Sequence, residues 1–299
     1  MPIRMHDHEV DVDETLVRRL LASQMPELAD ASLSIVEPWG TDNAVWRLGD
    51  ELVVRLPRVA GAKGQADKEA RWLPIIAEQL SIAVPEPIAV GDPEFGYPFR
   101  WAVLRWIAGH GARRDRMSDP TGFAGDLART VRELQVVPVS GAPPPRHRAR
   151  PLADYDEPTR RVIAGAAHLI DADAATAIWE DALAASPSDG PDVWVQGDLE
   201  GNCLVSDDGR LCGIVDWNSA CVGDPAVDVQ VAWSPLFTDA SRETFLDALD
   251  VDDATIRRSK GAAINQACAA LPYYLDTYPL IVERSQHKLA ALGVGPARS

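Results

Sequence analysis

The 299-residue sequence lacks several features that would place a protein in a class at once. It has no uninterrupted apolar run long enough to span a bilayer, so no membrane helix is expected. It has four cysteines and no C-x-x-C pair, which disfavours a disulfide scaffold or a zinc site. Its first residues are acidic and contain no apolar signal segment, and we therefore expect a cytoplasmic protein.

Basic residues are also scarce. Lys and Arg number 29 against 45 Asp and Glu, which gives a formal net charge of -16 at pH 7. A chain of this charge has no evident basic face for phosphate backbones, so no nucleic-acid partner is expected. The acidity is compatible with a cationic small-molecule partner, although solubility alone is a sufficient reason for it. The sequence does not indicate an oligomeric state.

The first third of the chain predicts an antiparallel sheet. Helical apolar periodicity begins after Asp13, and a second helix is expected over residues 64–80. Five strand-like segments surround this second helix, and tight turns join the first three of them. These segments are residues 32–37, 44–48, 51–56, one strand within 84–98, and 99–107. The length of the chain and this pattern predict a five-stranded N-terminal lobe over residues 1–107.

Residues 108–299 have a different character and predict a mainly helical second lobe. Helices are expected over 118–136, 159–169 and 172–184, and over most of the chain after Pro225. Two short apolar runs at 203–205 and 211–215 flank an Asp-Gly turn, which is a strong hairpin signal. Pairing these runs brings Asn202 and Asp216 to one end of the hairpin, with Asp198 just before them.

Three polar side chains at one hairpin end have a chemical use. A carboxylate can orient or deprotonate a hydroxyl group, and amide and carboxylate oxygens suit Mg²⁺. Phosphoryl transfer needs such a set together with a cation on the phosphates. Strand alternation over residues 52–56 turns Arg55 away from the apolar face. Glu69, on the following helix, is either its carboxylate partner or an ordinary surface residue.

Four segments make the chain resemble the aminoglycoside and macrolide phosphotransferase family, whose members are small-molecule kinases with a bilobal, protein-kinase-like fold. They are "WGTDNAVWRLGDELVVRLPR" (residues 39–58), "KEARWLPIIAEQL" (68–80), "QGDLEGN" (196–202) and "GIVDWNSACVGDPAVDV" (213–229). They occur in the expected order over most of the chain. The resemblance implies an α+β fold with a small N-lobe and a mainly helical C-lobe.

The resemblance also implies a role for each matching residue. Asp198 would be the catalytic base or the residue that orients the acceptor hydroxyl, and Asn202 and Asp216 would be the ligands of Mg²⁺. The nucleotide, ATP or GTP, would bind to the N-lobe, and an antibiotic hydroxyl would be the acceptor. The residues implied at the nucleotide are Thr41, Asp42 and Asn43 at the phosphates, Arg55 with Glu69 in place of the usual lysine pair, and Arg105, Trp106 and Ile107 at the purine. Asp224 and Asp228 would be structural.

The sequence departs from the family pattern at the catalytic loop. Gln196 stands where the family has His, and its amide could replace that brace. Asn202 follows Asp198 by four residues instead of five. Either the loop tightens and Asn202 still reaches the metal, or Glu200 supplies an oxygen, or the site is impaired; we favour the first.

Rival functions therefore stay open. A metabolite kinase of the same fold, acting on an amino alcohol or sugar, fits the same residues. A non-catalytic nucleotide-binding pseudokinase would explain the altered loop. A metal hydrolase is the last alternative, and its site would use Asp198, Asp216, Asp224 and Asp228. Such a site would lack the usual histidines and would leave Arg55 without a role.

Overall fold

The computed structural model describes residues 5–6, 8–37, 40–145, 149–188 and 190–297. The chain divides into two compact units. The first comprises Met1–Glu78 and Ala83–Ala108, and the second comprises Gln79–Ile82 and Gly109–Ser299. Among the described residues, no helix has both the length and the apolar character needed to cross a membrane.

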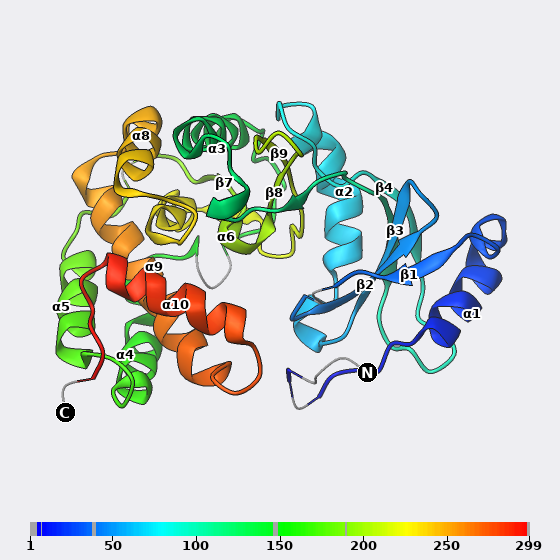
Figure 1. Cartoon of the computed structure of the whole chain (residues 1–299), viewed down its shortest axis with the longest axis horizontal. Coiled ribbons are helices and arrows are strands. Elements are labelled where there is room, and N and C mark those ends of the chain that lie inside the picture. Colours follow the sequence, from blue (N-terminus) through cyan, green and yellow to red (C-terminus); the bar gives the residue numbers. More distant parts are fainter. Residues whose placement is uncertain (1–4, 7, 38–39, 146–148, 189, 298–299) are drawn as a thin grey trace. The chain divides into compact units, whose positions relative to one another are not determined.

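The first unit contains one five-stranded antiparallel sheet, as the sequence predicts (Figure 1). Its strand order is β1-β2-β3-β5-β4, and two helices accompany it. The strands are β1 (Leu33–Ile35), β2 (Asn43–Leu48), β3 (Leu52–Pro57), β4 (Pro87–Gly91) and β5 (Trp101–Arg105), and the helices are α1 (Glu14–Gln24) and α2 (Gln65–Ala77). Short 3-10 turns at Pro26–Leu28 and Ala60–Ala62 complete the unit.

Strand alternation explains how β3 is placed. Val54 and Leu56 lie in the main apolar cluster that α1 also enters, whereas Val53 packs in a smaller cluster with Ala66 of α2. Arg55 therefore leaves β3 on the side of α2. The second helix runs through Pro74 as one element and ends at Ala77, earlier than the sequence pattern predicted.

The second unit is mainly helical and also holds two small sheets. Its longer helices are α3 (Pro120–Gln135), α4 (Asp156–Ala166), α5 (Ala172–Leu183), α8 (Asp239–Leu249), α9 (Asp253–Tyr273) and α10 (Pro279–Ala291). Single turns form α6 (Leu199–Asn202) and α7 (Ala226–Val229), and 3-10 turns lie at Arg114–Arg116, Leu152–Tyr155 and Gln230–Trp233. The strands β6 (His110–Gly111), β8 (Cys203–Val205) and β9 (Leu211–Ile214) form one sheet, and β7 (Val193–Val195) pairs with β10 (Cys221–Gly223) in the other.

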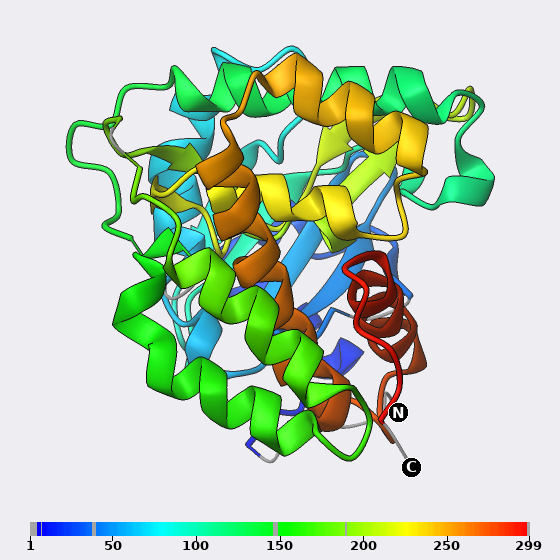
Figure 2. The same cartoon turned by 90° about the vertical axis from the view of Figure 1, so that its left-hand side faces the viewer.

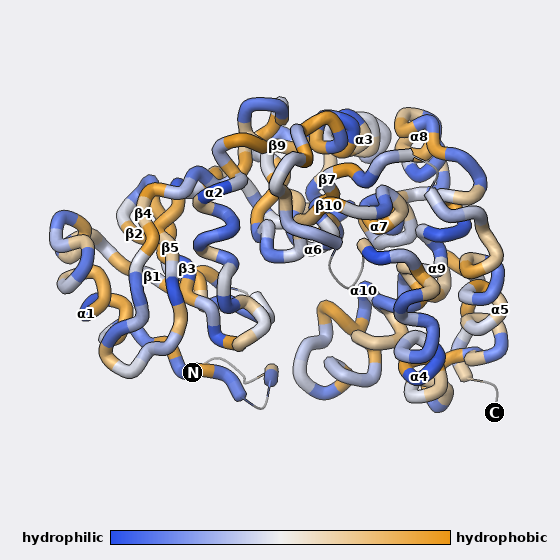
Figure 3. The backbone as a smooth tube through the Cα atoms, turned by 180° about the vertical axis from the view of Figure 1, so that it is seen from behind, coloured by the Kyte–Doolittle hydropathy of each residue, from blue (hydrophilic) through white to orange (hydrophobic). Residues whose placement is uncertain are grey.

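The long helix α9 is the centre of this unit. It packs against α4 and α5 on one side and against α10 on another (Figure 2). Buried side chains from these helices form one cluster, which includes Trp179, Ile264 and Leu289. Hydrophobic and hydrophilic positions alternate along the helices, as expected when each helix buries one face (Figure 3). This arrangement carries polar residues of α9 and α10 to the loop that precedes β8.

Candidate active site

The β8–β9 hairpin brings the predicted aspartate and asparagine residues to one end, as its pattern indicated. Cys203 pairs with Ile214 in antiparallel register, and Val215 donates its backbone N–H to the carbonyl of Asn202 over 2.9 Å. Asp216 is therefore the next residue after the last hairpin contact. Asn202 also donates its Nδ2 to the carbonyl of Asp198 over 2.8 Å. Within the second unit, the three sequence-predicted polar residues thus belong to one connected turn.

A helical turn accommodates the short spacing between Asp198 and Asn202. Leu199–Asn202 forms α6, so Asn202 lies one turn after Asp198 and folds back onto its carbonyl. Glu200 points elsewhere and forms an ion pair with Lys288 of α10 over 2.7 Å. This contact gives Glu200 a partner on α10 and supports the reading in which the loop tightens around Asn202.

Gln196 ties the two sides of this turn together. Its side-chain Oε1 accepts the backbone N–H of Asp198 over 2.7 Å, and its Nε2 donates to the carbonyl of Asp216 over 2.8 Å. The side chain is fully buried. An amide is suited to this position because it offers an acceptor and a donor at once. Gln196 thus braces the turn in the way expected from the sequence.

Asp228 also supports this turn, and this contact was not predicted from the sequence. Its carboxylate oxygens accept the backbone N–H groups of Gln196 and Gly197 over 2.8 and 2.7 Å. Burial raises the pKa of Asp228 to about 6, and the two backbone hydrogen bonds oppose that rise. Asp224 accepts the N–H of Ala226 and pairs with Arg258. Both residues are therefore structural, as expected.

Two residues of the turn have left-handed backbone conformations. Gly197 has a φ of +80°, and a Cβ there would lie 3.1 Å from Cβ of Ser219. Asp216 has a φ of 51°, which is uncommon for a residue with a side chain. Such conformations persist where surrounding contacts determine them, and they cluster at functional sites.

In the first unit, a buried network joins the predicted nucleotide residues. The Arg55 guanidinium pairs with Glu69, and both side chains are buried. Gln65 donates to the same carboxylate over 2.8 Å and accepts from the side chain of Asn43 over 3.0 Å. Glu69 is therefore not a surface residue. The network links the first residue of β2 with helix α2.

The other predicted nucleotide residues lie at two ends of the sheet, because Asn43 pairs with Pro57 at one end of β3 and Arg105 pairs with Leu52 at the other. The carbonyl of Asp42 accepts the backbone N–H of Arg58 over 2.7 Å, and Thr41 precedes it on the half-buried turn. The backbone N–H groups of Arg105 and Trp106 donate to the carbonyls of Glu86 and Glu51. A backbone contact from 105–107 to a purine would therefore use carbonyl groups or the N–H of Ile107.

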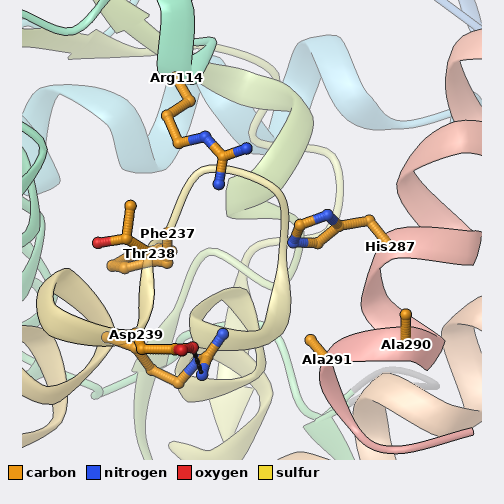
Figure 4. A pocket seen from close by; sticks show the side chains of 8 residues that line it. Arg114, Phe237, Thr238, Asp239, His287, Ala290 and Ala291 are labelled. Carbon is orange, nitrogen blue, oxygen red and sulfur yellow. Dashed lines mark hydrogen bonds and ion pairs between the residues drawn. The ribbon is translucent and has the colours of Figure 1, made fainter.

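A separate pocket of about 350 Å³ lies in the second unit (Figure 4). Arg114 and His287 point into it from different elements, and Arg242 lines it while pairing with Asp239. Burial and the nearby Arg114 guanidinium lower the pKa of His287. The lining is thus rich in nitrogen donors, which suits neutral or anionic groups better than cationic ones.

Two residues at the site were missed from the sequence. Gln266 of α9 donates its Nε2 to Oδ1 of Asp198 over 3.1 Å. Lys288 of α10 donates to Oε1 of Gln266 and pairs with Glu200. A lysine on the buried face of a helix was the one available signal, because lysine is almost never fully buried without a partner.

The oxygen atoms at the hairpin end are few but suited to Mg²⁺. Among the described residues, no group of three or more His, Cys, Asp or Glu side chains is placed to hold a metal ion. Mg²⁺ often uses only one or two protein oxygens and takes the rest from water and phosphates. Since Nδ2 of Asn202 is bound to Asp198, its Oδ1 is the amide atom that would face a cation. With a carboxylate at 216, the chemistry fits.

Comparisons with known proteins agree with this fold. A profile of the phosphotransferase enzyme family (APH) matches residues 36–262. No curated protein sequence matches the chain. Solved structures match over nearly the whole chain. Wild-type aminoglycoside 2'-phosphotransferase-IIIa with GDP has a TM-score of 0.75 at 16% identity and covers 94% of this chain and 99% of its own. Macrolide 2'-phosphotransferase MphH from Brachybacterium faecium has a TM-score of 0.60 at 25% identity, covering 94% and 97%.

Proposed function

The chain belongs to the phosphotransferase enzyme family, and from that premise we propose a specific reaction for this small-molecule kinase. It transfers the γ-phosphoryl group of ATP or GTP to a hydroxyl of an antibiotic of aminoglycoside or macrolide type, and so confers resistance. The reaction takes place in the cytoplasm, where both nucleotides are available. The chemical groups at the β8–β9 hairpin support this proposal.

One observation carries the proposal. The turn that holds Asp198 and Asn202 is braced on both sides by buried side chains, Gln196 and Asp228. Bracing of this kind holds a reacting group in place without cost at the moment of reaction. A turn that merely connected two strands would not need two buried side chains to hold its backbone.

Asp198 has the role of base in this proposal. The acceptor oxygen attacks the γ-phosphorus, and the bond from that phosphorus to the leaving nucleoside diphosphate breaks. The acceptor proton passes to the Asp198 carboxylate. Asn202 and Asp216 would hold Mg²⁺, which neutralises phosphate oxygens when bound.

The first unit is assigned to the nucleotide. Arg55, held by Glu69, would contact the phosphates as a fixed guanidinium. Thr41, Asp42 and Asn43 would cover them, and residues 105–107 would border the purine. In this proposal, residues 1–107 form the nucleotide lobe, and residues 108–299 carry the catalytic loop and the acceptor site.

The acceptor class is supported by the solved relatives. One structure contains an aminoglycoside phosphotransferase with GDP and kanamycin, and others are macrolide phosphotransferases. A cationic acceptor remains a prediction. The pocket lined by Arg114 and Arg242 would repel a polycation, so a cationic acceptor would have to use another surface of the second unit.

A nucleotide-consumption screen tests the proposal. ATP and GTP are each incubated with Mg²⁺ and panels of aminoglycosides, macrolides, amino alcohols and sugars, and the phosphorylated product is identified by mass spectrometry. We expect turnover with an antibiotic and a loss of about a hundredfold or more on Asp198→Ala, with nucleotide affinity nearly unchanged. Weaker nucleotide binding with unchanged turnover would remove Asp198 from this role.

The two rival functions give different results in the same screen. A metabolite kinase would consume nucleotide only with the amino alcohols or sugars. A pseudokinase would bind nucleotide and turn over no acceptor. For the metal, Asp216→Ala should abolish the Mg²⁺ dependence of nucleotide binding, and an unaltered response would remove Asp216 as a ligand.

A further inference from the structure

Helices α9 and α10 hold a polar chain that ends on the proposed base. Lys288 donates to Oε1 of Gln266, and Gln266 donates from Nε2 to Oδ1 of Asp198 over 3.1 Å. Lys288 also pairs with Glu200 over 2.7 Å. This series of polar side chains therefore starts and ends on the loop that holds Asp198 and Glu200. Between these ends it passes through Gln266 of α9, which comes 68 residues after Asp198 in the sequence, and through Lys288 of α10.

The burial of this chain is unusual for a lysine. Lys288 is 3% exposed, and the side chain of Glu200 is 11% exposed. Burying two opposite charges is costly unless their geometry is good, and replacing such a pair with apolar residues is often neutral or stabilising. Oε1 of Glu200 has no hydrogen-bond partner among the described residues. Stability alone is therefore a weak reason for the pair.

The ammonium group determines the orientation of the Gln266 amide. An amide can present either its oxygen or its nitrogen to a neighbour, but an ammonium has only donors. The oxygen of Gln266 must therefore face Lys288, and its NH₂ group then faces Asp198. A carboxylate only accepts hydrogen bonds, so the contact to Asp198 requires the same orientation of the Gln266 amide as the contact to Lys288.

We propose that Lys288 and Gln266 are positioning residues that hold the Asp198 carboxylate in its reactive orientation, with Glu200 as the counter-charge that keeps the ammonium in place. The inference rests on the proposed function, because it takes Asp198 to be the base. It concerns how the base is held, and both residues are assigned to act through Asp198.

The central variant is Lys288→Met combined with Glu200→Gln. This pair removes both charges together, so no unpaired charge stays buried, and methionine keeps the apolar stem. We expect the protein to fold with wild-type nucleotide KM and with kcat lowered about ten- to a hundredfold, since a misplaced catalytic group costs this much. Glu200→Gln alone leaves the ammonium on Gln266 and should lower kcat by less.

Gln266→Glu is the second variant because it keeps the shape and the contact to Lys288 but cannot donate to Asp198. We expect a kcat loss similar to that of the double variant, and no further loss when the changes are combined. The matched control is Asn265→Asp, the same amide-to-acid change one residue earlier, where the side chain contacts Thr159. It should leave kcat within about twofold.

Rates are measured as release of ADP or GDP from ATP or GTP with Mg²⁺, alone and with kanamycin or erythromycin as probe acceptors. A second measurement follows the Gln266 side-chain NH₂ signal by NMR, assigned by its loss in Gln266→Glu. The NH₂ signal should be shifted and slow to exchange in the wild type. It should lose both properties in the Lys288→Met/Glu200→Gln variant.

The outcomes separate this inference from the proposed function. Wild-type kcat in the folded double variant, or an NH₂ signal that does not change, would overturn the positioning role. Full turnover in Asp198→Asn would instead overturn the role of Asp198, while the NMR result would still report whether Lys288 orients Gln266. A rise in the acceptor KM together with an unchanged kcat would show that the residues contribute to binding and do not position the base, which would also overturn the inference.

Discussion

Gln196 donates a hydrogen bond from its side-chain amide to the backbone carbonyl of Asp216 over 2.8 Å, and its other amide atom accepts the N–H of Asp198. One buried side chain thereby links the proposed base to the proposed metal ligand. This link explains how a loop without the family's histidine keeps its two aspartates in a fixed relation.

Replacing Gln196 by leucine should loosen this link. The change removes both hydrogen bonds at a fully buried position, and we expect the free energy of unfolding to fall by about 2 to 4 kcal/mol. Turnover should fall as well. Urea unfolding and steady-state rates measure the two effects. Gln286→Leu, the same change at an exposed position of α10, is the control, and equal losses in both variants would contradict the bracing role.

Gly197→Ala should cost more than its backbone conformation alone explains. Gly197 has a φ of +80°, and an added Cβ would meet Ser219 at 3.1 Å. Gly293 has nearly the same φ, +83°, but no atom within 4 Å of such a Cβ. Gly293→Ala should destabilise by about 1 kcal/mol and leave turnover intact. For Gly197→Ala we expect a larger loss of stability, measured by thermal unfolding, and a lower turnover rate. Equal melting temperatures and equal turnover rates in the two variants would contradict this prediction.

Arg55→Ala should weaken both the first unit and nucleotide binding. It leaves the carboxylate of Glu69 buried without its ion-pair partner, which typically costs about 3 to 5 kcal/mol. Loss of a charged contact to phosphate should raise the nucleotide KM by about tenfold or more. Arg100 pairs with Asp67 of α2, the helix that also holds Glu69, and this pair is exposed. Arg100→Ala should therefore change neither the free energy of unfolding nor the nucleotide KM measurably. A nucleotide KM that stays at the wild-type value in Arg55→Ala would argue against phosphate contact.

Asp228 should make stability depend on pH in a recognisable way. Its pKa of about 6 in the folded chain lies above the value of about 3.9 for an exposed aspartate. The folded state therefore binds the proton more tightly than the unfolded state. The contribution of Asp228 to the free energy of unfolding is complete below about pH 4 and is lost as pH rises through about 6. The difference is about 3 kcal/mol at most.

Urea unfolding of the wild type and Asp228→Asn at several pH values measures this contribution. The other carboxyl groups are common to both proteins, so they cancel in the difference between the curves. We expect the wild type to lose stability relative to Asp228→Asn as pH rises from about 4 to 7. Parallel curves would show that burial does not raise the pKa of Asp228.

Local patterns were enough to predict the architecture and the proposed reacting groups. Apolar periodicity and turn residues indicated the five strands, and the Asp-Gly turn indicated the β8–β9 hairpin that collects Asp198, Asn202 and Asp216. These features depend on neighbours within a few residues of sequence, which is why they can be read directly. The short strands β6 and β10 were not predicted, because each pairs with a strand that is not its neighbour along the chain.

The sequence by itself determined the fold class, the hairpin and the set of groups that the reaction needs. Only the tertiary structure decided what holds those groups in place. Gln266 lies 68 residues from Asp198 in the chain, and Asp228 lies 32 residues from Gln196. Side chains that stabilise a loop from distant helices leave no local pattern, because their choice depends on how the helices pack. Because of that packing, a glutamine, a lysine and an aspartate support the one turn that is proposed to be catalytic.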